Sequence, residues 1–204
     1  SESISEDIRG NQTVSTTSID RDNKTVTQTV DYPDSTNHAV SVSINGLLVS
    51  STTKTGLEYT YSYDGLERRT GVTDPRTGTS ITDFNSLGQV DYAEDAATNR
   101  TTFAYESSTG RRISTTDALS NTVYTAYSVE GQTIGTWGAT YPVFYSFDDY
   151  DRMSGMFTLR DTNVAINSYS DFVSNSNSFD KTSWLYDEVT GLLTNKLYAD
   201  GNGT

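Results

Sequence analysis

The chain has 204 residues, a formal net charge of −13 at pH 7 and no cysteine. The negative charge excludes nucleic acid and anionic membranes as partners, because neutralising phosphate groups requires clustered Lys and Arg. Sulfated and uronate glycans are disfavoured for the same reason, unless a local basic patch or calcium offsets the field. The absence of cysteine excludes disulfides, thiolate nucleophiles and zinc sites of the cysteine type.

The hydropathy of the chain and its first residues indicate the compartment in which the protein works. No run of about 18 apolar residues is present, so no membrane-spanning segment is expected. The first residues, Ser1-Glu2-Ser3, contain neither an initiator Met nor a signal peptide. We therefore expect a piece of a longer exported chain that works outside the cell or at the cell surface.

Residues 1–56 are predicted to hold N-terminal strands with one clear hairpin. Its first strand alternates apolar residues with serines, at Val40, Val42 and Ile44. Asn45-Gly46 is the strongest two-residue hairpin signal, and the chain returns over 47–49. An earlier strand over 24–30 is expected to pair nearby. The single histidine, His38, is interpreted as an ordinary loop residue, since a triad or histidine-rich metal site would lack its other members.

The main feature of residues 57–159 is a tandem repeat of about 21 residues. Each copy opens with an aromatic residue that is usually followed by a polar or acidic one. Within this range the copies begin at Tyr63, Phe84, Tyr105, Tyr127 and Phe147, with successive offsets of 21, 21, 22 and 20 residues, and a further copy begins 39 residues later at Tyr186. A period in this range indicates a repeat array rather than an ordinary globular enzyme.

Two turns recur within each period. In four copies a glycine closes the first turn, where a residue able to adopt positive φ is needed: Gly88, Gly110, Gly131 and Gly191. Glu67 and Asp151 replace it in the other two. Half a period later a second turn begins with Asp and ends with Gly or Asn, over 74–78, 95–99 and 117–121. Two turns per period predict two short strands per period.

Between the turns, apolar and aromatic residues alternate with Thr and Ser, as in half-buried strands. The sequence therefore predicts an all-β fold in which two-stranded repeats form a continuous antiparallel sheet. The aromatic face is expected to be the buried one, including Phe103, Tyr105, Val123, Tyr127, Tyr145 and Phe147. The alternative is that these rings form an exposed platform for sugars or bases.

These motifs resemble the Rhs/YD-repeat family, whose unit runs approximately Y-D-x-x-G-R-L, then T-D-x-x-G and a returning strand. The resemblance covers about residues 57–200 and is carried by the segments 63–69 with 73–75, 105–112 with 116–117, and 186–193. Several copies depart from the pattern, with Asn85, Glu106 or Ser128 in place of the first Asp. Such drift indicates that the repeats serve shape rather than a shared catalytic site.

The resemblance implies a spiralling sheet that, in full-length Rhs and toxin-complex proteins, winds into a hollow shell around a toxic C-terminal domain. Those shells end in a self-cleaving segment that contains Asp-Pro. Asp74-Pro75 lies within an internal repeat and lacks that context. We therefore expect shell wall without protease or cargo, with flanking YD repeats of the parent chain as its partners.

The last part of the chain is less regular. Residues 160–183 lengthen one spacing to nearly two periods and are expected to be an insertion or surface loop. Residues 184–204 form a further, truncated YD repeat.

Exposed aromatics suggest a second function, a carbohydrate-binding module with a polysaccharide ligand. Trp137 is the preferred platform, because Trp137-Gly138 replaces the Thr-Asp of other copies and such departures can mark a grafted function. Tyr141 is a second exposed candidate. Arg111, Arg112 or the acids of 148–151 are the candidate polar neighbours, although the favoured interpretation of the two arginines is solvated strand ends paired with acids.

The densest acidic cluster is Asp148-Asp149-Tyr150-Asp151. Calcium is the only candidate cofactor, and Asp148, Asp149 and Asp151 could hold it. Alternatively, the cluster could supply one carboxylate of a glycosidase pair. No second acid is identifiable by spacing, and close carboxylates at a turn are mostly solvated. No catalytic residue is assigned, and the chain is interpreted as a non-catalytic structural segment.

Overall fold

The computed structural model describes residues 1–33 and 38–203. It is almost entirely β, with 17 strands, one short α-helix and one 3-10 turn. The chain divides into two compact units, Ser1–Arg100 and Thr101–Thr204, which are described separately.

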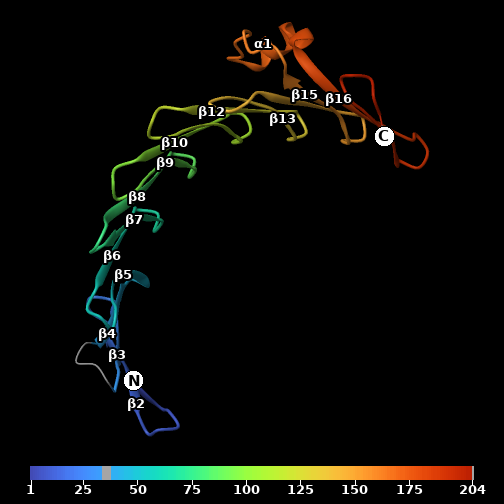
Figure 1. Ribbon diagram of the computed structural model, residues 1–204. Helices are drawn as coiled ribbons and strands as arrows, with labels where there is room; N and C mark the ends of the chain where they lie inside the picture. The colour runs from blue at the N-terminus through green and yellow to red at the C-terminus, as the bar shows by residue number, and fades with distance from the viewer. Residues whose placement is uncertain (34–37, 204) are drawn as a thin grey trace. The chain divides into compact units, whose positions relative to one another are not determined.

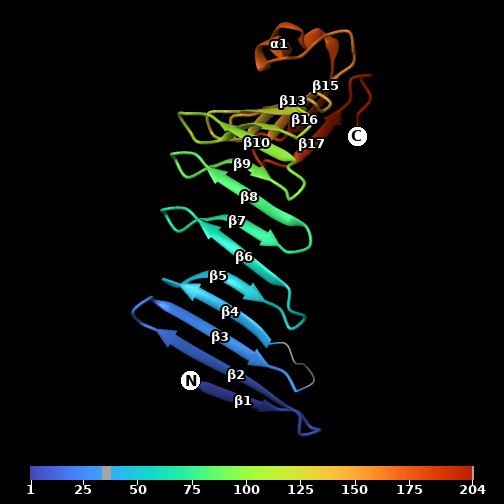
Figure 2. The same cartoon turned by 90° about the vertical axis from the view of Figure 1, so that its left-hand side faces the viewer.

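The first unit is a sheet in which each strand pairs antiparallel with the next one along the chain (Figure 2). Because successive strands run in opposite directions, alternate turns lie on opposite edges of the sheet. The strands are β1 (Glu2–Glu6), β2 (Gln12–Asp20), β3 (Thr25–Asp31), β4 (His38–Ile44), β5 (Leu47–Thr52), β6 (Glu58–Tyr63), β7 (Arg69–Asp74), β8 (Gly78–Phe84) and β9 (Val90–Glu94).

The expected N-terminal hairpin is confirmed. β4 and β5 pair across Asn45 and Gly46, which have φ values of 53° and 85°. Two consecutive positive φ angles match the twist of the flanking strands, which is why Asn-Gly is favoured there. The interpretation of His38 as a loop residue is wrong, since it begins β4 and its Nδ1 contacts Oδ1 of Asp31 on the neighbouring strand β3.

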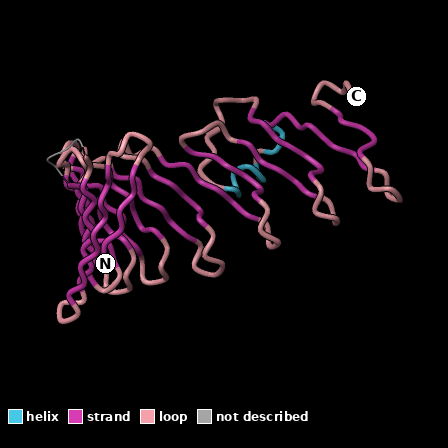
Figure 3. The backbone as a smooth tube through the Cα atoms, turned by 90° about the horizontal axis from the view of Figure 1, so that it is seen from below, coloured by secondary structure: helices cyan, strands magenta, loops and turns pink. Residues whose placement is uncertain are grey.

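The second unit follows the same antiparallel pairing of sequence neighbours. Its helical residues are confined to the segment between two of the strands, coloured cyan in Figure 3. The elements are β10 (Arg100–Tyr105), β11 (Arg112–Thr116), β12 (Thr122–Tyr127), β13 (Thr133–Gly138), β14 (Val143–Phe147), β15 (Met153–Leu159), α1 (Tyr169–Ser174), η1 (Ser176–Ser178), β16 (Phe179–Tyr186) and β17 (Leu193–Leu197).

The backbone of the first turns confirms the predicted glycine role. Gly88, Gly110, Gly131 and Gly191 all have positive φ, and so do Glu67 and Asp151, at 63° and 61°. The second turns agree with the prediction that the opening Asp bonds back to the backbone, since Asp95 Oδ1 accepts the N–H groups of Ala97 and Asn99. Positive φ falls on Thr98 and Ser120, and the Asn that follows each of them bonds through its side chain to the Asp that opens the turn.

A β-bulge accompanies every YD aromatic. In each of the six hairpins the register shifts by one residue at the aromatic, as where Ala104 faces Ser114 but Tyr105 faces Arg112. Each bulge leaves one unpaired residue in the second strand of the hairpin. The side chain next to this residue therefore lies on the same face as the aromatic, and the local twist of the hairpin increases.

The buried core of the second unit lies on the face opposite to the predicted one. Phe103, Thr115 and Val123 stand side by side in successive strands, so Tyr124 and its partner Trp137 face the other way. That other face carries the buried cluster Trp137, Phe144, Leu159, Ile166, Phe172 and Phe179. The YD aromatics share one face as predicted, but they are only half-buried.

The core forms where it does because residues 160–178 cover the sheet there. Figure 1 shows α1 on one face of the second unit, next to β15 and β16. Phe172 of α1 stacks on Phe144 with 4.1 Å between ring centroids. The helix is N-capped by Ser168, whose side chain accepts a hydrogen bond from the Asp171 N–H. Of the two alternatives for 160–183, the surface loop is wrong, because residues 160–178 are an insertion that packs on the sheet and β16 already begins at Phe179.

Candidate functional site: the contacts between repeats

In the copies that begin at Tyr63 and Phe147, the first turn is organised by the Asp that follows the aromatic. Asp148 Oδ1 accepts the backbone N–H groups of Tyr150 and Arg152, both at 3.0 Å, and its Oδ2 accepts Arg152 Nε at 2.7 Å. Asp64 makes the same three bonds to Leu66 and Arg68. The Asp-x-x-x-Arg spacing therefore closes a turn and orients the arginine.

The oriented arginine reaches forward to the next repeat. The Arg68 guanidinium lies over the ring of Phe84 at 4.3 Å, and that of Arg152 lies over Tyr186 at 4.4 Å. Both rings open the following copy. Favourable contact between a guanidinium and an aromatic face contributes about 0.5–1 kcal/mol at exposed sites.

Arg111 makes the same connection with hydrogen bonds. Its guanidinium donates to the carbonyl oxygens of Ser128 and Val129, at 2.7 and 3.2 Å, and lies 5.8 Å from the Tyr127 ring centroid. A Cβ at Gly131 would lie 2.9 Å from Arg111 Nη2, so this glycine serves close approach as well as positive φ. Gln132 stands at the arginine position of its own copy and donates from Nε2 to the Asp151 carbonyl at 3.0 Å.

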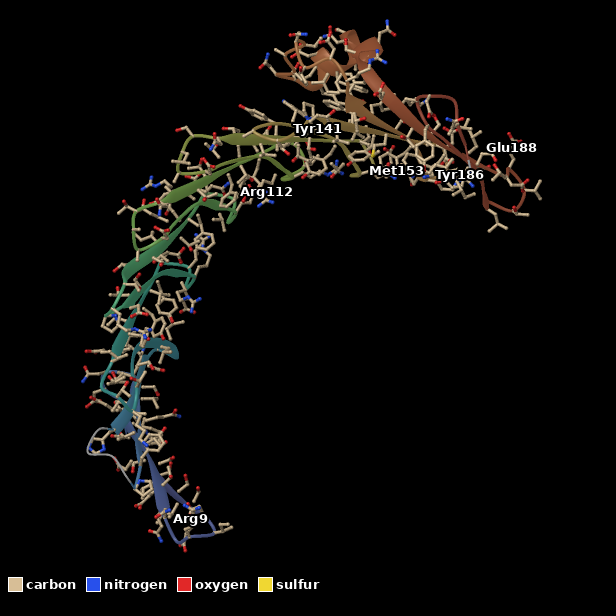
Figure 4. All side chains as sticks on the ribbon, viewed as in Figure 1. Arg9, Arg112, Tyr141, Met153, Tyr186 and Glu188 are labelled. Atoms are coloured by element: carbon tan, nitrogen blue, oxygen red, sulfur yellow. The ribbon has the colours of Figure 1, made fainter. Side chains whose placement is uncertain are left out.

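The opening tyrosine reaches backward to the preceding repeat. Its hydroxyl donates to a main-chain carbonyl at the start of the previous copy's second strand, from Tyr127 to Arg112 and from Tyr186 to Met153, both at 2.9 Å. Figure 4 shows Met153 and Tyr186 close together, on the face of the sheet away from α1. We call the forward Arg or Gln and the backward Tyr hydroxyl the repeat clasp.

The repeat clasp makes a prediction with a matched control. Arg111→Ala should lower the free energy of unfolding by about 1–2 kcal/mol, as expected when hydrogen bonds to a charged group are lost. Arg112 has the same charge, but its guanidinium lies over Phe103 on the paired strand of its own hairpin, at 5.4 Å, and does not reach the following copy. Arg112→Ala should therefore stay within about 0.5 kcal/mol. Urea unfolding of both variants measures the difference, and equal losses would contradict the clasp.

The residues proposed for a glycan platform are not brought together. Trp137 is 7% exposed and stacks between Tyr124 and Phe144, so the expectation of an exposed ring is wrong. Tyr141 is exposed, but its hydroxyl donates to the Leu159 carbonyl. Arg111 belongs to the repeat clasp, and Arg112 points to the face opposite Trp137.

The acidic turn does not gather ligands for calcium. The Asp148 carboxylate accepts hydrogen bonds from the backbone of its own turn and from the Arg152 side chain. Asp149 and Asp151 are exposed. Desolvation opposes ionisation of Asp148, but the hydrogen bonds from Arg152 outweigh it and lower its pKa. Within residues 1–33 and 38–203, no group of three or more His, Cys, Asp or Glu side chains could hold a metal ion. The structure thus gives calcium binding there no support.

The second turns give a pH prediction. The pKa values of Asp95 and Asp117 are lowered, first by side-chain hydrogen bonds from Asn99 and Asn121 and then by the backbone N–H groups of the same residues. A carboxylate whose folded pKa is depressed contributes stability above its unfolded pKa, about 3.9, and that stability is lost as the pH falls through the folded value. We expect the free energy of unfolding to fall steeply below about pH 4.

Denaturant unfolding between pH 2 and 7 measures this loss. Asp117→Asn removes one titrating group while keeping an acceptor oxygen for the turn. Its profile should be shallower than that of the native chain at acid pH. An unchanged profile would remove Asp117 from the explanation.

The chain is similar to known proteins in sequence and in fold. Residues 45–79 match the family model described as RHS Repeat. The crystal structure of TcdB2-TccC3-Cdc42 is similar with a TM-score of 0.51 and 14% identity, over 100% of this chain and 13% of that chain. For TcdB2-TccC3-TEV the values are 0.51 and 15%, over 98% and 11%. At such identities the likeness shows the fold alone, and the chain spans a small part of those proteins.

No curated protein matches the chain. Among its described residues, none of the helices has the length and apolar character needed to cross a membrane.

Proposed function

We propose that this chain, whose repeats belong to the Rhs/YD-repeat family, is a non-catalytic wall segment of a β-sheet shell or scaffold in a secreted or surface protein. The observation that carries the proposal is the repeat clasp. The residues that define the motif, namely the Asp, the Gly, the Arg and the aromatic, are engaged in closing turns and joining successive repeats. A motif used in this way builds a surface and leaves its carboxylates unavailable for chemistry.

The similarity to TcdB2-TccC3 supports the same proposal at the level of fold. The glycan alternative is weakened, because its preferred ring, Trp137, is part of the core. A glycan array probed with the chain tests that alternative directly. Saturable binding of an oligosaccharide, lost in Tyr141→Ala but not in Arg112→Ala, would replace the wall proposal with a binding module.

Extension of the sheet provides the decisive experiment. β17 pairs with β16, and the turn after it closes with a hydrogen bond from the Tyr198 N–H to the Asn202 carbonyl, as Asp117 bonds to Asn121. A second copy of residues 122–138, fused after Asn202, is thus positioned to add two strands. In a repeat array each new interface adds stability, so we expect the melting temperature to rise by a few degrees.

Leu192 supplies the matched variant for this experiment. It occupies the position of the clasp arginine in the last copy. Leu192→Arg should raise the melting temperature further in the extended chain, where a following tyrosine is present, and not in the native one. A fused copy that adds no stability would mean that the chain is a closed domain, against the wall proposal.

A further inference from the structure

A pocket of about 690 Å³ lies between the first turns of the copies that begin at Tyr127 and Phe147. The strands beside it, β13 and β14, pair at Gly135 with Phe144 and at Thr136 with Val143, and this ladder stops short of the two first turns. The strand ends there leave room for a ligand. We call this space the Phe147 pocket, and the lining residues that matter below are Glu130, Gln132, Phe147, Asp148, Asp149 and Asp151.

The equivalent space in other copies holds a guanidinium group. Arg68 lies over the ring that opens the next copy, Phe84, at 4.3 Å, and Arg152 lies over Tyr186 at 4.4 Å. Arg111 donates hydrogen bonds to the first two carbonyl oxygens of the next first turn. The molecule itself thus shows which group fits between two first turns. It is a planar cation, held by the face of a ring and by main-chain oxygens.

The Phe147 pocket has the same surroundings but no cation of its own. Gln132 occupies the arginine position; it is shorter and neutral, and it donates to the Asp151 carbonyl. Among the residues that the structure describes, no Lys or Arg lies over the Phe147 ring. The carbonyl oxygens of residues 148–149 correspond to those that accept the hydrogen bonds of Arg111 one copy earlier.

The carboxylates around the pocket favour a positively charged ligand. Asp148 is paired with Arg152 at 2.7 Å, but Asp149 and Asp151 are exposed and form no ion pair within residues 1–33 and 38–203. Glu130, on the other side of the pocket, is exposed as well. Carboxylates without a partner, beside the open face of a ring, attract cations and repel anions.

We propose that the Phe147 pocket binds the guanidinium group of an arginine side chain carried by another polypeptide segment. The guanidinium lies over the Phe147 ring, donates to the carbonyl oxygens of residues 148–149 and pairs with Asp149 and Asp151. Arginine suits the pocket better than lysine, because its planar group stacks on a ring and donates in several directions, whereas an ammonium group is more strongly hydrated. Free arginine fits less well, since the acids repel its carboxylate. The inference does not depend on the wall function, because a closed domain would present the same pocket.

An NMR titration of the full chain tests the pocket. The probe is a capped pentapeptide with one central arginine and four glycines. Amide signals of residues 128–132 and 148–151 should shift together and saturate, with a dissociation constant in the millimolar range, about that of one small contact. The same peptide with citrulline, which keeps the shape and lacks the charge, should cause no saturable shift. The lysine peptide and free arginine should bind about fivefold more weakly or worse.

Gln132→Arg is the matched variant, because it supplies the guanidinium from the chain itself. It should abolish peptide binding and raise the melting temperature, as the repeat clasp of the other copies is restored. Ser86→Arg adds the same charge at an exposed position of another first turn and should change neither result. Phe147→Leu, and Asp149→Asn combined with Asp151→Asn, should each weaken binding by about fivefold or more. Melting curves verify that every variant is folded at the temperature of the titration.

Three results would overturn the assignment. The first is saturable binding of the citrulline peptide, or equal binding of the lysine peptide. The second is peptide binding that survives in folded Gln132→Arg. The third is a set of shifts spread over the whole chain, which would show only general attraction of a cation to a protein of charge −13. Free arginine that binds as tightly as the peptide would assign the pocket to the amino acid instead of a polypeptide.

Discussion

Phe144→Ala should unfold the second unit at a much lower urea concentration than the native chain. Phe144 is fully buried, and its ring contacts those of Trp137, Phe172 and Phe179 at centroid distances of 5.9, 4.1 and 5.6 Å. Truncating a buried phenylalanine costs about 3–5 kcal/mol, which approaches the whole stability of many domains. The α1 segment loses its main support at the same time.

Phe103→Ala is the control for this prediction, because Phe103 lies half-buried on the opposite face. Its loss should cost clearly less. Tryptophan fluorescence and circular dichroism during urea unfolding report both variants. If Phe103 proved the more costly residue, the core would lie on the YD face after all.

Trp137→Ala should have the second-largest effect, about 3 kcal/mol or more. The ring stacks on Tyr124 and Phe144, and its buried Nε1 has no hydrogen-bond partner. Trp137→Phe should therefore retain most of the stability, since it keeps an aromatic ring and removes a buried donor without an acceptor. Trp184 remains as the fluorescent reporter of unfolding.

The same variant distinguishes the two functions considered for the chain. A residue that serves as an exposed sugar platform can be truncated within about 1 kcal/mol. A melting temperature unchanged in Trp137→Ala would therefore contradict the buried position of the ring. A large loss, with no glycan bound by the native chain, agrees with a wall whose aromatics serve packing.

Local features of the fold were predictable from the sequence because they are set by local chemistry. The Asn45-Gly46 hairpin, the two turns per period and the positive φ at Glu67 follow from turn preferences and from counting residues. The resemblance to the Rhs/YD-repeat family is confirmed by the match over residues 45–79. In these places one short segment determines its own conformation.

The position of the core was not predictable in the same way. Period-2 alternation identifies two faces, but which face is buried depends on what covers it, and here the cover comes from residues 160–178. A signal was present in the glycines of β13 and β15. A Cβ at Gly135 would lie 2.3 Å from Phe144 Cδ1, and Gly155 is also buried. Glycine beside large aromatics in strands indicates close packing on that face.

The candidate site was predictable only in part. The Asp-x-x-x-Arg spacing is visible in the sequence, but the direction in which each side chain reaches is not. The sequence places Arg111 beside a ligand or in solvent, whereas in the structure it joins one repeat to the next. That link spans 17 and 18 residues, so it depends on the register of the whole sheet. The prediction that Trp137 is exposed is wrong, because a departure from the repeat consensus also occurs where a core is built.

The segment between β15 and β16 shows how such arrays can diversify. β15 and β16 pair from Gly155 with Ser183 to Leu159 with Phe179, without a shift in register, although residues 160–178 replace a short turn. A long excursion at that edge therefore leaves the hydrogen-bonded ladder intact. Other second turns, such as the one opened by Asp117, are grafting points by the same logic, where evolution or an engineer can install a binding loop or a whole domain while the sheet beneath keeps its pairing.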